Sequence, residues 1–163
     1  MYIRKKILFL LPLIFSLSVL SSDIEEIIVK GEYREKSLGE EDSSIVIIQS
    51  EQIKSQAIKH FQQLSHLVPN LNYAASDSRA RYFQIRGIGE RSGYQGTPNS
   101  SVGFLIDDID YSGQGGIATL FDVDQVEVFR GPQGSRSGAN ALAGLIYIKT
   151  KDPTEKFEGT SEL

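Results

Sequence analysis

The amino-acid sequence predicts an α+β fold, in which short helices pack around a small β-sheet. Short runs rich in β-branched, aliphatic and aromatic residues recur along the chain between glycines, prolines and aspartates, as strands joined by turns do. Between two of these runs, apolar residues recur instead at helical spacing. The expected strands cover residues 45–48, 82–86, 102–106, 126–130 and 145–150. The 163 residues, 40% hydrophobic and 23% charged, suffice for one modest globular domain.

Residues 1–22 have the layout of a secretory signal peptide. Three basic residues at positions 4–6 precede an apolar run over positions 7–20, and Ser21 and Ser22 follow it. At 1.5 Å per residue, a helix of these 14 residues is shorter than the ~30 Å hydrocarbon core of a bilayer. A signal peptide is therefore favoured over a membrane anchor.

Charge and cysteine content exclude several classes of function. Residues 1–22 carry three basic side chains and no acidic one, so their removal changes the formal net charge from −4 to −7. An exported chain this acidic is a poor candidate for binding nucleic acid. The chain has no cysteine, which rules out disulfides and thiolate metal sites but is compatible with an oxidising periplasm.

The first helix is expected directly after the strand at 45–48. Ser50 is a suitable N-cap, and Glu51 in the first turn favours the helix dipole. Such a helix would carry Ile53, Ala57 and Ile58 toward the core.

A second short helix follows, and a helical turn is expected further along the chain. Phe61, Leu64 and Val68 recur at helical spacing, and the Pro-Asn pair at 69–70 ends the run. The later helical turn is expected over residues 117–121, after a glycine-rich loop at 112–116.

No resident metal ion or cofactor is predicted. His60 and His66 are interpreted as surface residues, because no cysteine or further histidine completes a ligand set. The aspartates lack EF-hand spacing, so a solvated turn is favoured over a calcium site; they are Asp107, Asp108, Asp110, Asp122 and Asp124. The glycines at 87–93 have G-x-G-x-x-x-G spacing, which does not fit a dinucleotide site, and no Gly-Lys-Ser/Thr triplet is present.

An enzyme is the least favoured class. Ser135 and Ser137 lie in a glycine-rich stretch, but no histidine or carboxylate pair is placed beside them and no G-x-S-x-G motif occurs. We therefore predict no catalytic residues.

The stretch from Val126 to Lys151, VEVFRGPQGSRSGANALAGLIYIKTK, reads as a strand, a glycine-studded loop and a second strand. The glycines between the strands argue against a stable helix there. This stretch resembles the signature of the plug domain of TonB-dependent outer-membrane receptors, and the resemblance extends from about Glu25 to the end of the chain. It implies a plug domain with a small mixed β-sheet over residues 43–153. It also implies gated, energy-coupled uptake of a nutrient such as an iron–siderophore complex at the outer membrane.

Residues 23–42 are charge-rich and are expected to be a flexible N-terminal segment. From the residues alone, the segment is a fluctuating acidic leader or a short edge strand. The resemblance implies a TonB box, and its residues are Glu25, Glu26, Ile27, Ile28 and Val29. Its partner would be the C-terminal domain of TonB, which would bind the extended peptide by adding it to a sheet edge.

Two arginines, Arg86 and Arg130, each end a predicted strand directly before a glycine. From the residues alone they are surface charges at strand ends. The resemblance implies instead a charge cluster with glutamates on the inner wall of a 22-stranded β-barrel, which holds the plug in place.

The resemblance also implies that two loops face the bound nutrient. The predicted ligand-facing residues lie in the loop at 87–101 and around 111–114, and they are Arg91, Tyr94, Gln95, Tyr111 and Gln114. The family usually has Asp-Gly at the turn after strand 102–106, so Asp108 departs from the pattern; aspartate tolerates left-handed geometry better than most residues.

Residues 154–163 are expected to begin the first barrel strand. The sequence ends at Leu163, before any barrel. Three interpretations of the chain are therefore open: a fragment of a receptor, a truncated product, or a stand-alone periplasmic module that binds TonB or ligand without transport. Iron chelates, cobalamin and sugars are all cargo classes that the resemblance allows.

Overall fold

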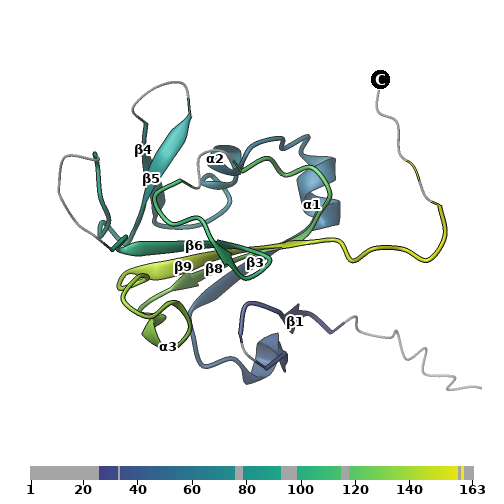
Figure 1. The fold of residues 1–163 in the computed structure, drawn as a ribbon, viewed down its shortest axis with the longest axis horizontal. Coiled ribbons are helices and arrows are strands. Elements are labelled where there is room, and N and C mark those ends of the chain that lie inside the picture. The colour runs from purple at the N-terminus through teal and green to yellow at the C-terminus, as the bar shows by residue number, and fades with distance from the viewer. Residues whose placement is uncertain are drawn as a thin grey trace, which may run out of the picture.

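The computed structural model describes residues 26–32, 34–75, 79–92, 99–114, 118–157 and 159. Its centre is a five-stranded sheet with the strand order β3-β8-β9-β6-β7 (Figure 1). The bounds are Ile45–Gln49 for β3, Val102–Ile106 for β6, Ile109–Asp110 for β7, Val123–Arg130 for β8 and Gly144–Thr150 for β9. Strands β6 and β9 are parallel and the other pairs are antiparallel, so the predicted mixed sheet is confirmed.

Short elements cover both faces of this sheet (Figure 1). On one side lie the helices α1, Ser50–Ser55, and α2, Phe61–Leu64, with the hairpin of β4, Leu71–Ala75, and β5, Ala80–Ile85. On the other side lie β1, Ile28–Val29, and β2, Lys36–Ser37, followed by the 3₁₀ helix η1, Leu38–Glu40. A further short helix, α3, consists of Gly134–Ser137.

The larger core fills the space between the sheet and the helices. Phe61 of α2 meets Phe83 and Phe104 edge-on, with ring centroids 4.9 and 5.2 Å away. Phe83 and Phe104 stack at 5.6 Å. Such aromatic pairs are worth ~0.5–1.5 kcal/mol beyond their buried area, so Phe61, together with the fully buried Leu64, holds α2 against the sheet.

A second, smaller core lies on the opposite face. Its buried members are Val29, Leu105, Phe129, Ala141, Leu145 and Tyr147. Because both faces are covered, most of β8 and β9 is buried on both sides, which explains the unbroken apolar run over residues 144–148 of β9. Val29 contributes to this core, so the N-terminal segment is part of the packed structure.

The first helix is shorter than predicted. It ends at Ser55, and Ala57 is exposed with a φ of 51°, whereas Ile53 is buried. The prediction of Ser50 as N-cap is wrong, because Gln49 holds that position and Ser50 donates its hydroxyl to Glu51. The left-handed Ala57 closes the helix, because its N–H and that of Ile58 donate to the carbonyl oxygens of Lys54 and Ile53, over 3.0 and 3.1 Å.

Other boundaries also differ from the predictions. The helix α2 ends at Leu64, although Val68 is buried as predicted. Strand β4 was not predicted, since only its first residue is fully buried. The glycine-rich stretch contains α3, contrary to the expectation that its glycines prevent a helix. Residues 118–121 form no helix, and Thr119 makes an isolated β-bridge with His60 instead; position 117 lies outside the described residues.

The turn between β6 and β7 uses two aspartates in left-handed geometry. Asp107 and Asp108 have φ values of 45° and 70°, as a two-residue hairpin turn requires. This agrees with the expectation that aspartate tolerates the position. Within the described parts of the chain, no helix has the length and apolar character needed to cross a membrane.

Candidate functional site

The N-terminal segment that was predicted to bind a partner is docked on the sheet. Ile28 and Val29 form β1, which pairs antiparallel with β2. Val29 is fully buried, whereas Ile28 is 41% exposed and Glu26 is exposed. Glu25 lies outside the described residues. The structure thus assigns Ile28 and Val29 to a short strand.

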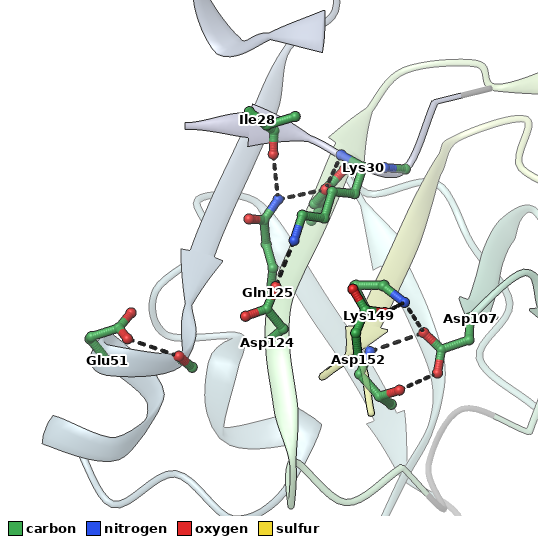
Figure 2. Close-up of polar contacts among 12 residues, drawn as sticks. Ile28, Lys30, Glu51, Asp107, Asp124, Gln125, Lys149 and Asp152 are labelled. Atoms are coloured by element: carbon green, nitrogen blue, oxygen red, sulfur yellow. Dashed lines mark hydrogen bonds and ion pairs between the residues drawn. The ribbon is translucent and has the colours of Figure 1, made fainter. Parts of the chain in front are cut away.

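Two side chains of β8 hold this segment. The main-chain N–H groups of Lys30 and Gly31 donate to the two carboxylate oxygens of Glu127, over 2.6 and 2.8 Å. The side-chain amide of Gln125 donates to the carbonyl oxygen of Ile28, over 2.9 Å, and Figure 2 shows Gln125 beside Ile28 and Lys30. Glu127 is fully buried, and a buried carboxylate needs such donors to offset its lost hydration.

The docking contact leaves no room for a side chain at position 31. A Cβ atom on Gly31 would lie 2.6 Å from Oε2 of Glu127 and 2.6 Å from Cε2 of Phe129. Neither Gly31 nor Glu127 was identified from the sequence. The one available signal was a charged residue, Glu127, inside the apolar run VEVF.

An ion pair adds a weaker contact at the edge of this site. Nζ of Lys30 lies 2.7 Å from Oδ2 of Asp124 (Figure 2). Both side chains are partly exposed, at 28% and 38%, so the pair is expected to contribute less than ~1 kcal/mol. The docking therefore depends more on the burial of Val29 and on the main-chain contacts to Glu127 than on this ion pair.

The two predicted cluster arginines lie at strand ends that meet at one glycine. A Cβ atom on Gly144 would lie 2.3 Å from the carbonyl oxygen of Phe129 and 2.7 Å from Cδ1 of Ile85. Arg86 and Arg130 directly follow these two neighbours, so both arise in the same region. Arg86 is exposed with a φ of 55°, and the buried Nε of Arg130 has no hydrogen-bond partner among the described residues.

The predicted ligand-facing residues are only partly described. Tyr94 and Gln95 lie outside the described residues. Arg91 and Gln114 are exposed, whereas Tyr111 packs partly against the larger core.

Hydrogen bonds tie the loops that carry these residues to one another. Asn140 accepts from the main-chain N–H of Ser100 over 3.1 Å and donates to Asp110 over 2.9 Å. Arg81 of β5 donates to the carbonyl oxygen of Gly113 over 3.5 Å. The segments around 100, 110–113 and 140 therefore meet at one end of the sheet.

A buried glutamate fastens both stems of the loop at 87–101. Glu90 accepts hydrogen bonds from the main-chain N–H and the hydroxyl of Ser101, over 2.9 and 2.6 Å. Its own carbonyl oxygen accepts from Gln84. Sequence analysis did not single out Glu90, because its partner lies 11 residues away across the loop.

At the opposite end of the sheet, Asp107 links the β6–β7 turn to the end of β9. Burial alone would raise the pKa of Asp107, but hydrogen bonds from Thr150 and the charge of Lys149 outweigh it, so the pKa is lowered. A hydrogen bond to Asp152 and the charge of Asp107 raise the pKa of Lys149 (Figure 2). Within the described ranges, no group of three or more histidine, aspartate or glutamate side chains is arranged to hold a metal ion.

Comparison with known proteins shows to which family the chain is similar. The model of the TonB-dependent receptor plug domain matches residues 37–145. The pesticin receptor of Yersinia pestis is 26% identical over 155 residues, which are 94% of this chain and 23% of the relative. The ferripyoverdine receptor of Pseudomonas aeruginosa is 24% identical over 121 residues, 74% of this chain and 14% of the relative.

Solved structures show the same fold. The ferric yersiniabactin uptake receptor of Yersinia pestis matches with a TM-score of 0.59 and 27% identity, over 70% of this chain and 18% of that chain. The outer-membrane ferripyoverdine receptor of Pseudomonas aeruginosa, bound to ferripyoverdine, matches with a TM-score of 0.65 and 19% identity, over 80% and 17%. The chain thus spans about a quarter or less of the length of these relatives.

Proposed function

This chain belongs to the TonB-dependent receptor plug domain family, and from that premise we propose that it gates the energy-coupled uptake of a nutrient at the outer membrane. The observation that carries the proposal is the N-terminal strand β1. It is extended and lies at the margin of the fold, and its Ile28 side chain is substantially exposed. Strand addition to a partner sheet needs an extended segment of this kind, whose main-chain groups are released to the partner.

The nutrient that we propose is an iron–siderophore complex. The relatives include receptors named for ferripyoverdine and for ferric yersiniabactin uptake. The loops around Arg91, Tyr111 and Gln114 would face it, since Asn140 and Arg81 join the segments beside them at one end of the sheet. Tyr94 and Gln95 belong to the same predicted loop. Ligand binding there would be relayed to release of the N-terminal segment, which TonB then captures.

We further propose that Arg86 and Arg130 pair with carboxylates of the receptor wall that surrounds the plug. The buried Nε of Arg130, without a hydrogen-bond partner among the described residues, supports this role. Arg130 is partly exposed, but its buried Nε is a donor that is costly to leave without a partner.

The substitution Ile28→Pro tests capture by TonB. Proline removes the main-chain donor of residue 28 and resists a strand ladder, so the affinity for the C-terminal domain of TonB should fall by at least about tenfold. The matched control is Ile28→Ala, which keeps that donor and should bind nearly as the original chain does. A calorimetric titration measures both. Equal affinity of the proline and alanine variants would rule out strand addition at this residue.

A further inference from the structure

We propose that Gln125 and Glu127 imitate a partner strand: their side chains occupy the main-chain edge of residues 28–30 that TonB would take, so that docking and capture compete. The inference rests on the proposed function, because TonB is the competitor that it names. It assigns a role to Gln125 and Glu127, which lie outside the predicted binding stretch, and to Gly31, two residues after the last residue named for the TonB box.

The pairing of β1 with β2 uses only one edge of the stretch. Ile28 is opposite Ser37, and the N–H of Leu38 donates to the carbonyl oxygen of Ile27 over 2.9 Å. Hydrogen-bonded and non-hydrogen-bonded pairs alternate in an antiparallel ladder, so Ile28 and Ser37 form a non-hydrogen-bonded pair. The main-chain N–H and C=O groups of Ile28 therefore point away from β2, and those of Lys30 follow the same direction.

Side chains of β8 occupy this second edge (Figure 2). The carbonyl oxygen of Ile28 accepts from Nε2 of Gln125, and the N–H of Lys30 donates to Oε1 of Glu127. Gln125 also donates to Glu127 over 2.6 Å, so each side chain orients the other. One donor and one acceptor, aimed at alternate residues of an extended segment, are what a neighbouring strand would provide.

Gly31 sets the register of this contact. Its N–H donates to Oε2 of Glu127, and an added Cβ atom would fall 2.6 Å from that oxygen. Only a segment with glycine at this point can approach so closely. The φ angle of Gly31 is not positive, so glycine is required here for lack of space and not for its backbone conformation.

Competition follows from the shared edge. A strand from TonB that pairs along this edge would need the same groups of Ile28 and Lys30 that Gln125 and Glu127 already engage. The apparent affinity of TonB is then its intrinsic affinity multiplied by the fraction of molecules in which the segment is undocked. Weakening the docking contact should raise that affinity without any change in the segment that TonB reads.

The test uses the full chain with Gly31→Ala, and Gly39→Ala as the matched control. Position 39 lies in the same segment, but a Cβ atom there would meet only Oγ of Ser37, at 3.8 Å. Hydrogen exchange of the amides at positions 30 and 31 should accelerate at least about tenfold in Gly31→Ala and not in Gly39→Ala. Amides of β8 and β9 should exchange unchanged, which shows that the core is intact.

Glu127→Gln is the second variant, and it keeps the size of the side chain. It places an amide donor against N–H groups that need an acceptor, so the same two amides should again exchange faster. If neither Gly31→Ala nor Glu127→Gln accelerates exchange at positions 30 and 31, the docking role is overturned.

Titration with the C-terminal domain of TonB completes the test. Gly31→Ala and Glu127→Gln should bind several-fold to about tenfold more tightly than the original chain and Gly39→Ala. Faster exchange with unchanged or weaker binding would overturn the competition. If neither the original chain nor any variant binds TonB, the proposed function itself is contradicted. The exchange data would still report the docking contact in that case.

Discussion

Asp107 shows how one side chain joins two parts of the sheet. It occupies a left-handed turn position, and its carboxylate accepts from the main chain and hydroxyl of Thr150 while it faces Lys149. The turn thus fixes the end of β9, from which the chain leaves the sheet (Figure 1).

The lowered pKa of Asp107 predicts a pH-dependent stability. Since the folded pKa lies below the ~3.9 of an unfolded aspartate, the charged form stabilises the fold above that pH, and the stabilisation is lost as pH falls through the folded value. Asp107→Asn keeps the turn geometry, because asparagine also tolerates left-handed backbone. We expect it to be less stable at pH 7, by no more than ~1 kcal/mol given partial exposure, and to match the original chain near pH 2.

Denaturant unfolding at several pH values measures this difference. Asp152→Asn is the control, since the Asp152 side chain is 80% exposed and should contribute little. If Asp107→Asn differs from the original chain by the same unfolding free energy at pH 2 and pH 7, the charged Asp107 carboxylate is not the stabilising group.

At the scale of elements, α2 is only four residues long and depends on packing for its stability. Phe61 is almost fully buried between Phe83 and Phe104, so Phe61→Ala should cost ~3–5 kcal/mol of unfolding free energy. Phe121→Ala is the control, because that ring is 87% exposed and its loss should change stability by less than ~0.5 kcal/mol. Chemical denaturation that gave similar values for both would refute this view of the core.

The same dependence on packing explains which elements could be predicted from the sequence. Strands β6 and β9 were predicted to within one residue at each end, because they are apolar on both faces. Strand β4 has only Leu71 fully buried and gives no such pattern. The helix α1 ends before Ala57, because Ala57 is in left-handed geometry and the N–H groups of Ala57 and Ile58 turn back to the carbonyl oxygens of Lys54 and Ile53.

Long-range contacts were beyond the reach of sequence patterns. Gly31 and Glu127 are 96 residues apart, and no local motif connects them. The resemblance supplied the family and the TonB-box interpretation of the stretch around Ile28, and the family match over residues 37–145 confirms the family. The surface that receives the strand could not be predicted from the sequence, because it is formed only in the fold, where β8 places Gln125 and Glu127 on the same face.

At the scale of the whole molecule, we assign partner binding and nutrient binding to different parts of the sheet. Partner binding is assigned to one face, and nutrient binding to the loops at one end. The face with α1 and α2 forms the larger core, and the other face receives the N-terminal segment. The loops proposed to face the nutrient meet at one end of the sheet, tied by Asn140 and Arg81.

The central claim is that this chain acts as the plug of an outer-membrane receptor, and the native location of the product tests it most directly. An antibody against residues 43–153 would be applied to fractionated cell envelopes, with and without boiling. We predict a large band in the outer-membrane fraction whose mobility changes on boiling. A small, soluble periplasmic band would contradict the claim and would favour a binding module that captures TonB or ligand without transport.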